Sequence, residues 1–167
     1  MIAIPGAARS ALVALLLGGL VGCAGGPDAA ALQKDVESAL QAKDFAGAVT
    51  KADAALQAET IAKDPAKSWR FESLKLEALA DGGKGPEVVA GLTRLATTYD
   101  KQLTAATYRK LADKLRASGN SVGANDVLVL GDKRFPTDPS FKEAIKALNT
   151  EGDPAEVERL KALGYLN

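Results

Sequence analysis

The sequence predicts an all-α fold, and three observations indicate it. Apolar side chains between Tyr108 and Pro136 recur at three and four residues, which places them on one face of a helix. Asp-Pro pairs at 64–65, 138–139 and 153–154 mark helix starts, because the carboxylate accepts from free backbone N–H groups and proline fits the first turn. With 47% hydrophobic but 5% aromatic residues, the core consists mainly of Ala, Leu and Val, which suits closely packed helices.

Start and stop signals divide the chain into eight predicted helices. Asp28, Asp44 and Gly85-Pro86 give starts in addition to the Asp-Pro pairs. The run Val127–Leu130 is the best strand candidate, but the helical stripe around it favours a buried helix. The predicted helices cover residues 28–42, 44–59, 65–81, 86–99, 101–117, 120–134, 139–149 and 154–164.

The stretch from Tyr108 to Pro136 predicts a helical hairpin. Gly119-Asn120 ends its first helix, because glycine adopts the left-handed conformation at a helix end without steric cost. The second helix has its own one-sided stripe, and Pro136 closes it. The apolar and small residues of the two stripes are Tyr108, Leu111, Ala112, Leu115, Ala124, Leu128 and Gly131.

The order of these residues resembles the tetratricopeptide repeat, whose signature combines an aromatic residue, Leu, small residues, Gly, Ala and a final Pro. Leu115 and Leu128 stand where the family more often has an aromatic residue. The resemblance implies a right-handed array of antiparallel helical hairpins, that is, a tetratricopeptide-like α-solenoid that binds proteins. The match reads Tyr108-x2-Leu111-Ala112-x2-Leu115, Gly119, Ala124-x3-Leu128, Gly131 and Pro136.

Three alanines indicate how often the hairpin repeats. Ala48, Ala90 and Ala124 each follow a predicted turn, at intervals of 90 − 48 = 42 and 124 − 90 = 34 residues. The second interval equals the tetratricopeptide period. We therefore expect about three hairpins, in which Arg94 and Thr97 continue the stripe of Ala90. The helices after residue 138 are expected to form a C-terminal cap.

Residues 1–22 have the layout of a cleaved export signal. Arg9 precedes an apolar run from Ala11 to Leu17, which is shorter than the ~20 residues needed to span a bilayer. The adjoining Leu20-Val21-Gly22-Cys23 resembles the lipobox of bacterial lipoproteins. The resemblance implies cleavage before Cys23 and covalent attachment of a diacylglycerol and an N-acyl lipid to this residue.

The predicted organisation is therefore a lipoprotein signal peptide (1–22), a lipidated tether (23–27) and a tetratricopeptide-like repeat domain (28–167). Two or three acyl chains hold a protein on a bilayer, since each buried methylene contributes about 0.8 kcal/mol. Ala24 replaces the Asp that tends to retain such lipoproteins on the inner membrane. By resemblance this favours the outer membrane, facing the periplasm, or the plasma membrane in an organism with a single membrane.

Charge and composition argue against several functions. The 21 basic side chains balance 21 acidic ones, so no net field draws the chain to nucleic acid. Histidine is absent, which removes the commonest general base and metal ligand, and the one cysteine is assigned to lipid. We expect no catalytic residue, no metal and no cofactor, and the chain is not predicted to be an enzyme.

The predicted function is protein–protein docking or scaffolding in the bacterial cell envelope. By resemblance, the first helix of each hairpin lines a concave face that receives an envelope protein or peptide. Arg109 and Arg116 lie two turns apart there and would bind carboxylates, unless Asp113 pairs with them. The residues expected on this face are Glu37, Glu72, Lys75, Arg109, Asp113 and Arg116.

Two alternatives to docking stay open at this point. The first is a structural envelope lipoprotein without a specific peptide site. The second is a carboxylate-based periplasmic hydrolase, which requires a deep cleft lined by two facing acids.

Overall fold

The computed structural model of the protein describes residues 28–148 and 153–167. The predicted signal peptide, Cys23 and the tether lie outside the described residues. All regular structure in the described ranges is helical, which confirms the all-α prediction. The described helices are α1 (Ala29–Gln41), α2 (Phe45–Gln57), α3 (Glu59–Ala62), α4 (Pro65–Asp81), α5 (Gly85–Thr98), α6 (Ala105–Ala117), α7 (Ser121–Arg134), α8 (Ser140–Leu148) and α9 (Pro154–Ala162).

The helices begin where the carboxylates and prolines predict. Asp64 accepts hydrogen bonds from the N–H groups of Ala66 and Lys67, and Pro65 is the first residue of α4. The run Val127–Leu130 lies within α7, so it is helical as predicted. The short helix α3 was not predicted as a separate element, and it stands where the helix predicted for 44–59 ends.

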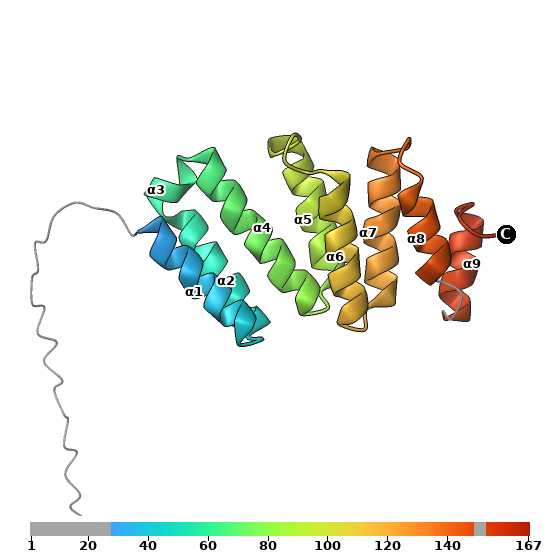
Figure 1. Cartoon of the computed structure of the whole chain (residues 1–167), viewed down its shortest axis with the longest axis horizontal. Helices are drawn as coiled ribbons and strands as arrows, with labels where there is room; N and C mark the ends of the chain where they lie inside the picture. Colours follow the sequence, from blue (N-terminus) through green and yellow to red (C-terminus); the bar gives the residue numbers. More distant parts are fainter. Residues whose placement is uncertain (1–27, 149–152) are drawn as a thin grey trace, which may run out of the picture.

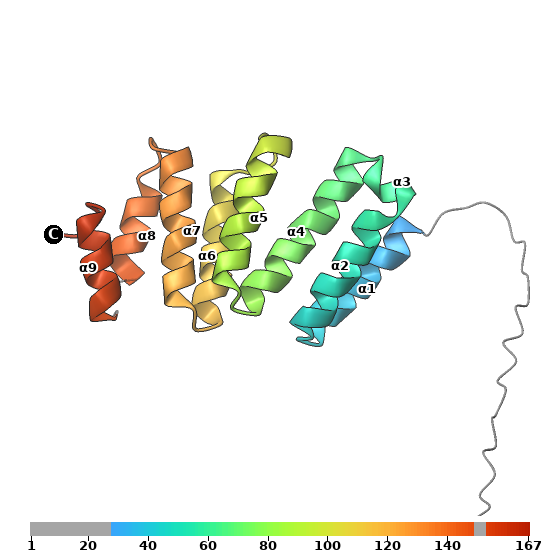
Figure 2. The same ribbon diagram turned by 180° about the vertical axis from the view of Figure 1, so that it is seen from behind.

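The long helices form one row in which successive helices run in opposite directions (Figure 1). α1 packs against α2, α6 packs against α7, and α4 contacts α2, α5 and α6. α1, α4 and α6 lie toward the viewer in Figure 1, whereas α2, α5 and α7 lie toward the viewer in Figure 2. The row therefore has one face built from the first helix of each pair and another built from the second.

Three turns between paired helices share one backbone geometry. Each holds a residue in the left-handed region, namely Lys43 (φ 58°), Gly83 (φ 72°) or Gly119 (φ 87°). This residue donates its N–H to the carbonyl three positions earlier, and the next residue donates to the carbonyl five positions earlier. The next residue is also the N-cap of the second helix, and these N-caps are Asp44, Lys84 and Asn120.

Counting from these N-caps corrects the predicted register of α5. The buried hydrophobic side chains of α5 are Val88, Leu92 and Leu95, which lie four, eight and eleven residues after the N-cap. The predicted stripe of Ala90, Arg94 and Thr97 is wrong, because those residues are exposed. The prediction aligned the helices by their alanines, whereas the structure shows that they correspond when aligned by their N-caps. The equivalent buried residues are Ala48, Ala52 and Ala55 in α2, and Ala124, Leu128 and Gly131 in α7.

Two hydrophobic cores meet at α4. Phe71, Leu74 and Ala78 belong to a first core with residues of α1, α2 and α3. Leu76 and Ala80 belong to a second core, which continues through α5, α6, α7, α8 and α9. Because the two sets alternate along α4, this helix joins the first helix pair to the rest of the row.

α8 and α9 pack at the end of the row. Phe141 and Ile145 of α8 and Leu160 of α9 are fully buried. Leu163, which directly follows the end of α9 at Ala162, is 48% exposed. After α9 the chain turns back, and the Tyr165 hydroxyl donates to Asp132 at 3.0 Å. Burial raises the pKa of Tyr165 to about 12.

Candidate functional site

A groove of about 440 Å³ crosses the face formed by the first helices of the pairs. Its side chains leave α4 and α6 at spacings of three and four residues, so each helix presents one stripe to it. Leu40 and Leu74 supply apolar surface, and charged side chains surround them. We call it the α1–α4–α6 groove, and it is lined by Glu37, Leu40, Gln41, Arg70, Leu74, Glu77, Asp81, Lys110 and Lys114.

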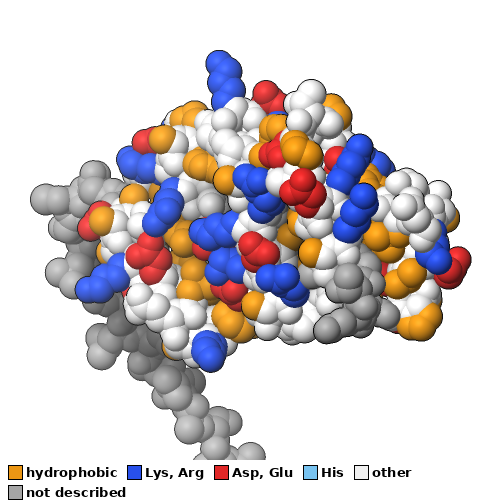
Figure 3. Space-filling model, turned by 45° about the vertical axis from the view of Figure 1, so that its right-hand side comes forward, with side chains coloured by type: hydrophobic (Ala, Val, Ile, Leu, Met, Phe, Trp, Pro, Cys, Tyr) orange, Lys and Arg blue, Asp and Glu red, His pale blue; other side chains and the backbone are white. Residues whose placement is uncertain are grey.

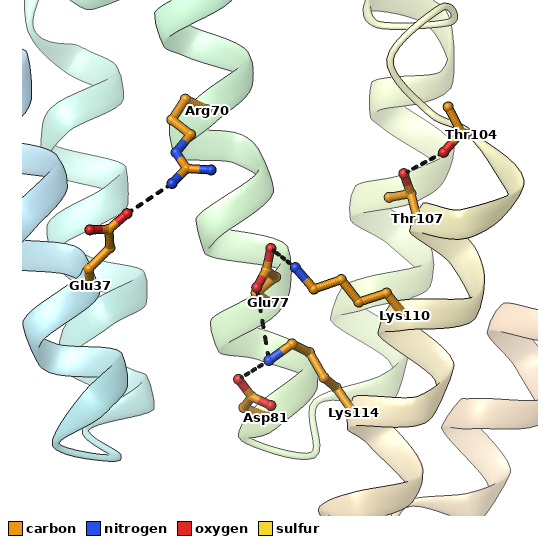
Figure 4. Close-up of polar contacts among 8 residues, drawn as sticks. All are labelled: Glu37, Arg70, Glu77, Asp81, Thr104, Thr107, Lys110 and Lys114. Carbon is orange, nitrogen blue, oxygen red and sulfur yellow. Dashed lines mark hydrogen bonds and ion pairs between the residues drawn. The ribbon is translucent and has the colours of Figure 1, made fainter.

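Three hydrogen-bonded ion pairs in this groove connect neighbouring first helices, and the Lys114 ammonium also lies 3.9 Å from the Glu77 carboxylate (Figure 4). One joins α1 to α4, and two join α4 to α6. The two partners of every hydrogen-bonded pair are 33 residues apart in the sequence. This constant interval places the paired charges at corresponding positions on successive first helices. The pairs are Glu37–Arg70 at 2.9 Å, Glu77–Lys110 at 2.7 Å and Asp81–Lys114 at 2.7 Å.

The charges in the groove stay accessible to a ligand. The side chains of Arg70 and Lys110 are 52% and 57% exposed, and such pairs contribute only about 0.2–1 kcal/mol to stability. A lysine ammonium has three donors, and among the described residues the Lys110 ammonium donates a hydrogen bond to Glu77. Figure 3 shows this face obliquely, with basic and acidic side chains interleaved and hydrophobic surface between them.

A second hollow of about 210 Å³ continues the groove between α4 and α6. It shares Glu77 and Lys110 with the α1–α4–α6 groove. Thr104 and Thr107 line it, and their hydroxyl oxygens lie 3.3 Å apart (Figure 4). Because hydroxyls both donate and accept hydrogen bonds, this hollow adds neutral polar groups beside the charged pairs.

The structure places five of the six residues predicted for this face outside the α1–α4–α6 groove. Glu37 lines the groove. Glu72 points the other way and accepts two hydrogen bonds from Arg94 of α5, at 2.9 and 2.7 Å. Lys75 donates to Asp53 of α2 at 2.6 Å. The prediction chose residues by helix, whereas the direction of each side chain depends on its position within the turn.

The three predicted residues of α6 lie beyond the groove. Arg109 donates to the Ser140 hydroxyl at 2.5 Å and lies 3.8 Å from Asp138, at the start of α8. The hydrogen bonds from Ser140 lower the pKa of Asp138. Asp113 lies 3.7 Å from Arg116, and both side chains are exposed. Arg109 thus contacts the start of α8, Asp113 and Arg116 contact each other within α6, and none of the three lines the groove.

Five charged groove residues were missed by the sequence analysis. They form the α4 and α6 sides of the three ion pairs. The signal that would have found them is the recurrence of opposite charges 33 residues apart. The missed residues are Arg70, Glu77, Asp81, Lys110 and Lys114.

The acids of the groove are arranged as ion-pair partners. Glu77 and Asp81 are one turn apart on the same face of α4, and each accepts a hydrogen bond from a lysine of α6. The hydrolase alternative requires two acids that face each other across a cleft. In the part of the chain that the structure describes, no group of three or more His, Cys, Asp or Glu residues is placed to hold a metal ion.

No helix within the described ranges has the length and apolar character needed to cross a membrane. The membrane contact predicted from the sequence is the lipid on Cys23, outside the described residues. No protein-family model matches the chain, and neither a curated protein nor a solved structure matches it.

Proposed function

We propose that the chain is an exported bacterial lipoprotein that docks another envelope protein through the α1–α4–α6 groove. Diacylglycerol and an N-acyl lipid on Cys23 anchor it, with the outer membrane favoured by Ala24. The observation that carries the docking proposal is the set of three partly exposed, hydrogen-bonded ion pairs across one groove. Partly exposed ion pairs contribute little to the stability of the fold, but their charges can be recognised by a protein segment.

The domain is further proposed to be a right-handed tetratricopeptide-like α-solenoid. The three turns with a left-handed residue before the N-cap support this assignment. The 33-residue interval of the groove ion pairs is close to the 34-residue tetratricopeptide period and supports it independently. Arrays of this kind bind partners along the face of their first helices, which is where the groove lies.

The expected ligand is a partner segment with both basic and acidic side chains. The groove presents three cations and three anions, so a segment of one sign of charge would meet repulsion along part of its length. Leu40 and Leu74 offer apolar contact between the charged pairs. The order of charges would therefore select the partner and its direction in the groove.

Anchoring is tested by labelling cells with a fatty-acid analogue. We expect the wild-type chain to incorporate the label and Cys23→Ala to remain unlabelled and unprocessed. Equal labelling of the two chains would reject the lipid anchor.

Docking is tested by exchanging charges within a pair. Glu77→Lys with Lys110→Glu keeps an ion pair but reverses its order, so stability should change by less than about 1 kcal/mol. A photoreactive residue at Gln41 should crosslink one partner in native envelopes, and the exchange should abolish the crosslink.

A photoreactive residue at Lys101, outside the groove, is the matched control and should give no such crosslink. Equal crosslinks from Gln41 before and after the exchange would contradict docking in the groove. No crosslink from Gln41 at all would favour a structural envelope lipoprotein without a peptide site.

A further inference from the structure

The opposite face carries a second groove, between α2 and α5. Two adjoining hollows of about 530 and 430 Å³ share Val49, Leu79 and Glu87. α4 forms the floor, because α2 and α5 both pack against it. Figure 2 shows α4 between these two helices, whereas α5 packs directly against α7. The row of second helices is therefore open between α2 and α5, and we call this opening the α2–α5 groove.

The α2–α5 groove is apolar along its middle. Val49 of α2 and Leu79 of α4 are partly exposed in it. On the α5 side the groove is bordered by the small residues Ala90 and Gly91, which leave it open. A Cβ added to Gly91 would lie 2.6 Å from the Leu76 side chain, so the backbone of α5 nearly touches the floor. An amphipathic helix packs its apolar side into a groove of this kind.

The charged side chains form ion pairs at one end of the α2–α5 groove and none at the other end, within the described residues. At one end the lining carboxylates of Asp53 and Glu72 are held by Lys75 and Arg94. At the other end Lys43 and Lys84 stand in two of the turns and line the groove. Neither lysine makes an ion pair with any residue that the structure describes.

Two acidic side chains line the same end of the groove. The Asp44 carboxylate accepts from the Gly47 N–H at 2.9 Å, as the N-cap of α2. Glu87 is the other lining acid, and it lies in the first turn of α5. The turn end of the groove therefore offers two exposed ammonium groups to an incoming carboxylate.

We infer that the α2–α5 groove binds an amphipathic helix of a partner protein, with acidic residues at the end of that helix beside Lys43 and Lys84. The apolar middle receives the apolar side of the helix, and the lysines pair with its carboxylates. If the acidic end is the C-terminus of the helix, its dipole adds to the attraction. This site lies on the face opposite the α1–α4–α6 groove, so it stands independently of the proposed function.

The test is selection from a displayed library of random peptides, with the full chain as bait. We expect enriched peptides to carry apolar residues at helical spacing and acids at one end. Ala90→Trp should abolish their binding, because the indole fills the groove from an exposed position. Ala117→Trp, exposed and outside the groove, should leave binding unchanged.

The electrostatic part is tested on one selected peptide by fluorescence anisotropy. Lys43→Glu combined with Lys84→Glu should weaken binding by about tenfold at low salt, and the loss should shrink as salt is added. Lys101→Glu is the matched control. Circular dichroism of each variant establishes that the helices are retained.

Three outcomes would overturn the inference. The first is enrichment of basic or non-helical peptides, or no enrichment at all. The second is binding that survives Ala90→Trp. The third is a concentration-dependent dimer in sedimentation that Ala90→Trp abolishes, since the groove would then belong to a second copy of the chain.

Discussion

Glu72 of the α4–α5 pair occupies the position that corresponds to Tyr108 in the α6–α7 pair. It lies 84 − 72 = 12 residues before the N-cap Lys84, and Tyr108 lies 120 − 108 = 12 residues before Asn120. Both residues are buried, at 8% and 1% exposure. Arg94 holds the carboxylate with two hydrogen bonds, which raise the pKa of Arg94. An ion pair thus replaces apolar packing between α4 and α5.

Removing one partner of this pair should cost more than removing both. Arg94→Ala leaves the Glu72 carboxylate without its donor, and we expect the free energy of unfolding to fall by about 1–3 kcal/mol. Glu72→Leu combined with Arg94→Leu replaces both groups with apolar side chains and should lie close to wild type. Urea denaturation measures both, and equal losses in the single and double variants would contradict this account.

Glu156 is a second buried carboxylate, and it fastens α9 to α7. It accepts hydrogen bonds from Asn125 at 2.9 Å and from Arg159 at 2.7 and 2.6 Å. The hydrogen bonds from Arg159 are the largest cause that lowers the pKa of Glu156 below its ordinary value of 4.5. The attachment of the last helix therefore depends on pH.

The sign of this dependence follows from the lowered pKa. A carboxylate whose native pKa lies below its unfolded value stabilises the fold above that unfolded value, and the gain is lost as pH falls through the native pKa. Glu156→Gln should lower the free energy of unfolding by about 1–3 kcal/mol at neutral pH. The difference from wild type should shrink below pH 4.5.

Urea unfolding over a series of pH values checks this, with Glu158→Gln as an exposed control on the same helix. A difference between Glu156→Gln and wild type that stays constant down to acidic pH would mean that Glu156 does not titrate with folding.

Single residues could be predicted from sequence where their partners are local. Asp64 is followed by Pro65, and its cap bonds reach only two and three residues ahead. Glu72 and Glu156 pair with residues 22 and 31 positions away, in addition to any local contact. No local pattern reveals such partners, so the burial of these two acids appears only in the fold.

At the scale of the helices, small residues set the distance between α5 and α7. A Cβ added to Gly123 would lie 2.8 Å from the Gly85 Cα, so no side chain fits there. The Asn120 amide donates to the Gly83 carbonyl at 2.8 Å and joins the two turns. Ala124, the next residue after Gly123, is fully buried. The two helix starts are thus held by backbone contact.

Ala124→Leu should destabilise the fold, because the added methylenes have no space beside α5. We expect a loss of about 1–3 kcal/mol in the free energy of unfolding, from overpacking. Ala90→Leu is the matched control, since Ala90 is exposed and should change stability by less than about 0.5 kcal/mol. Thermal and urea unfolding measure the pair, and similar values for the two variants would contradict the corrected register of α5.

The long helices could be predicted from sequence because start signals and apolar stripes are local. The α1–α4–α6 groove could not, because it depends on which stripe of each helix faces the next. Glu72 and Glu77 both lie on α4, yet they point to α5 and α6 respectively. The distance in sequence from Glu72 to the N-cap of the next helix indicates that its side chain faces α5. The opposite charge 33 residues after Glu77 indicates that its side chain faces α6.

At the scale of the whole molecule, stability is divided between two cores that share α4. Ile61 of α3 belongs to the first core and Ile145 of α8 to the second, and both are fully buried. In a row of repeats the stability is roughly a sum over units and their interfaces, so one end can open while the other stays folded. The two isoleucines therefore report on different parts of the row.

Ile61→Val and Ile145→Val make the same chemical change in the two cores. Each should lower stability by about 0.5–1.5 kcal/mol, which is roughly two- to tenfold in an opening equilibrium. In hydrogen exchange we expect Ile61→Val to speed exchange in α1 and α2 while α7 and α8 keep the wild-type rate. Ile145→Val should do the reverse. Equal acceleration along the whole chain in both variants would show one cooperative unit and would refute the division at α4.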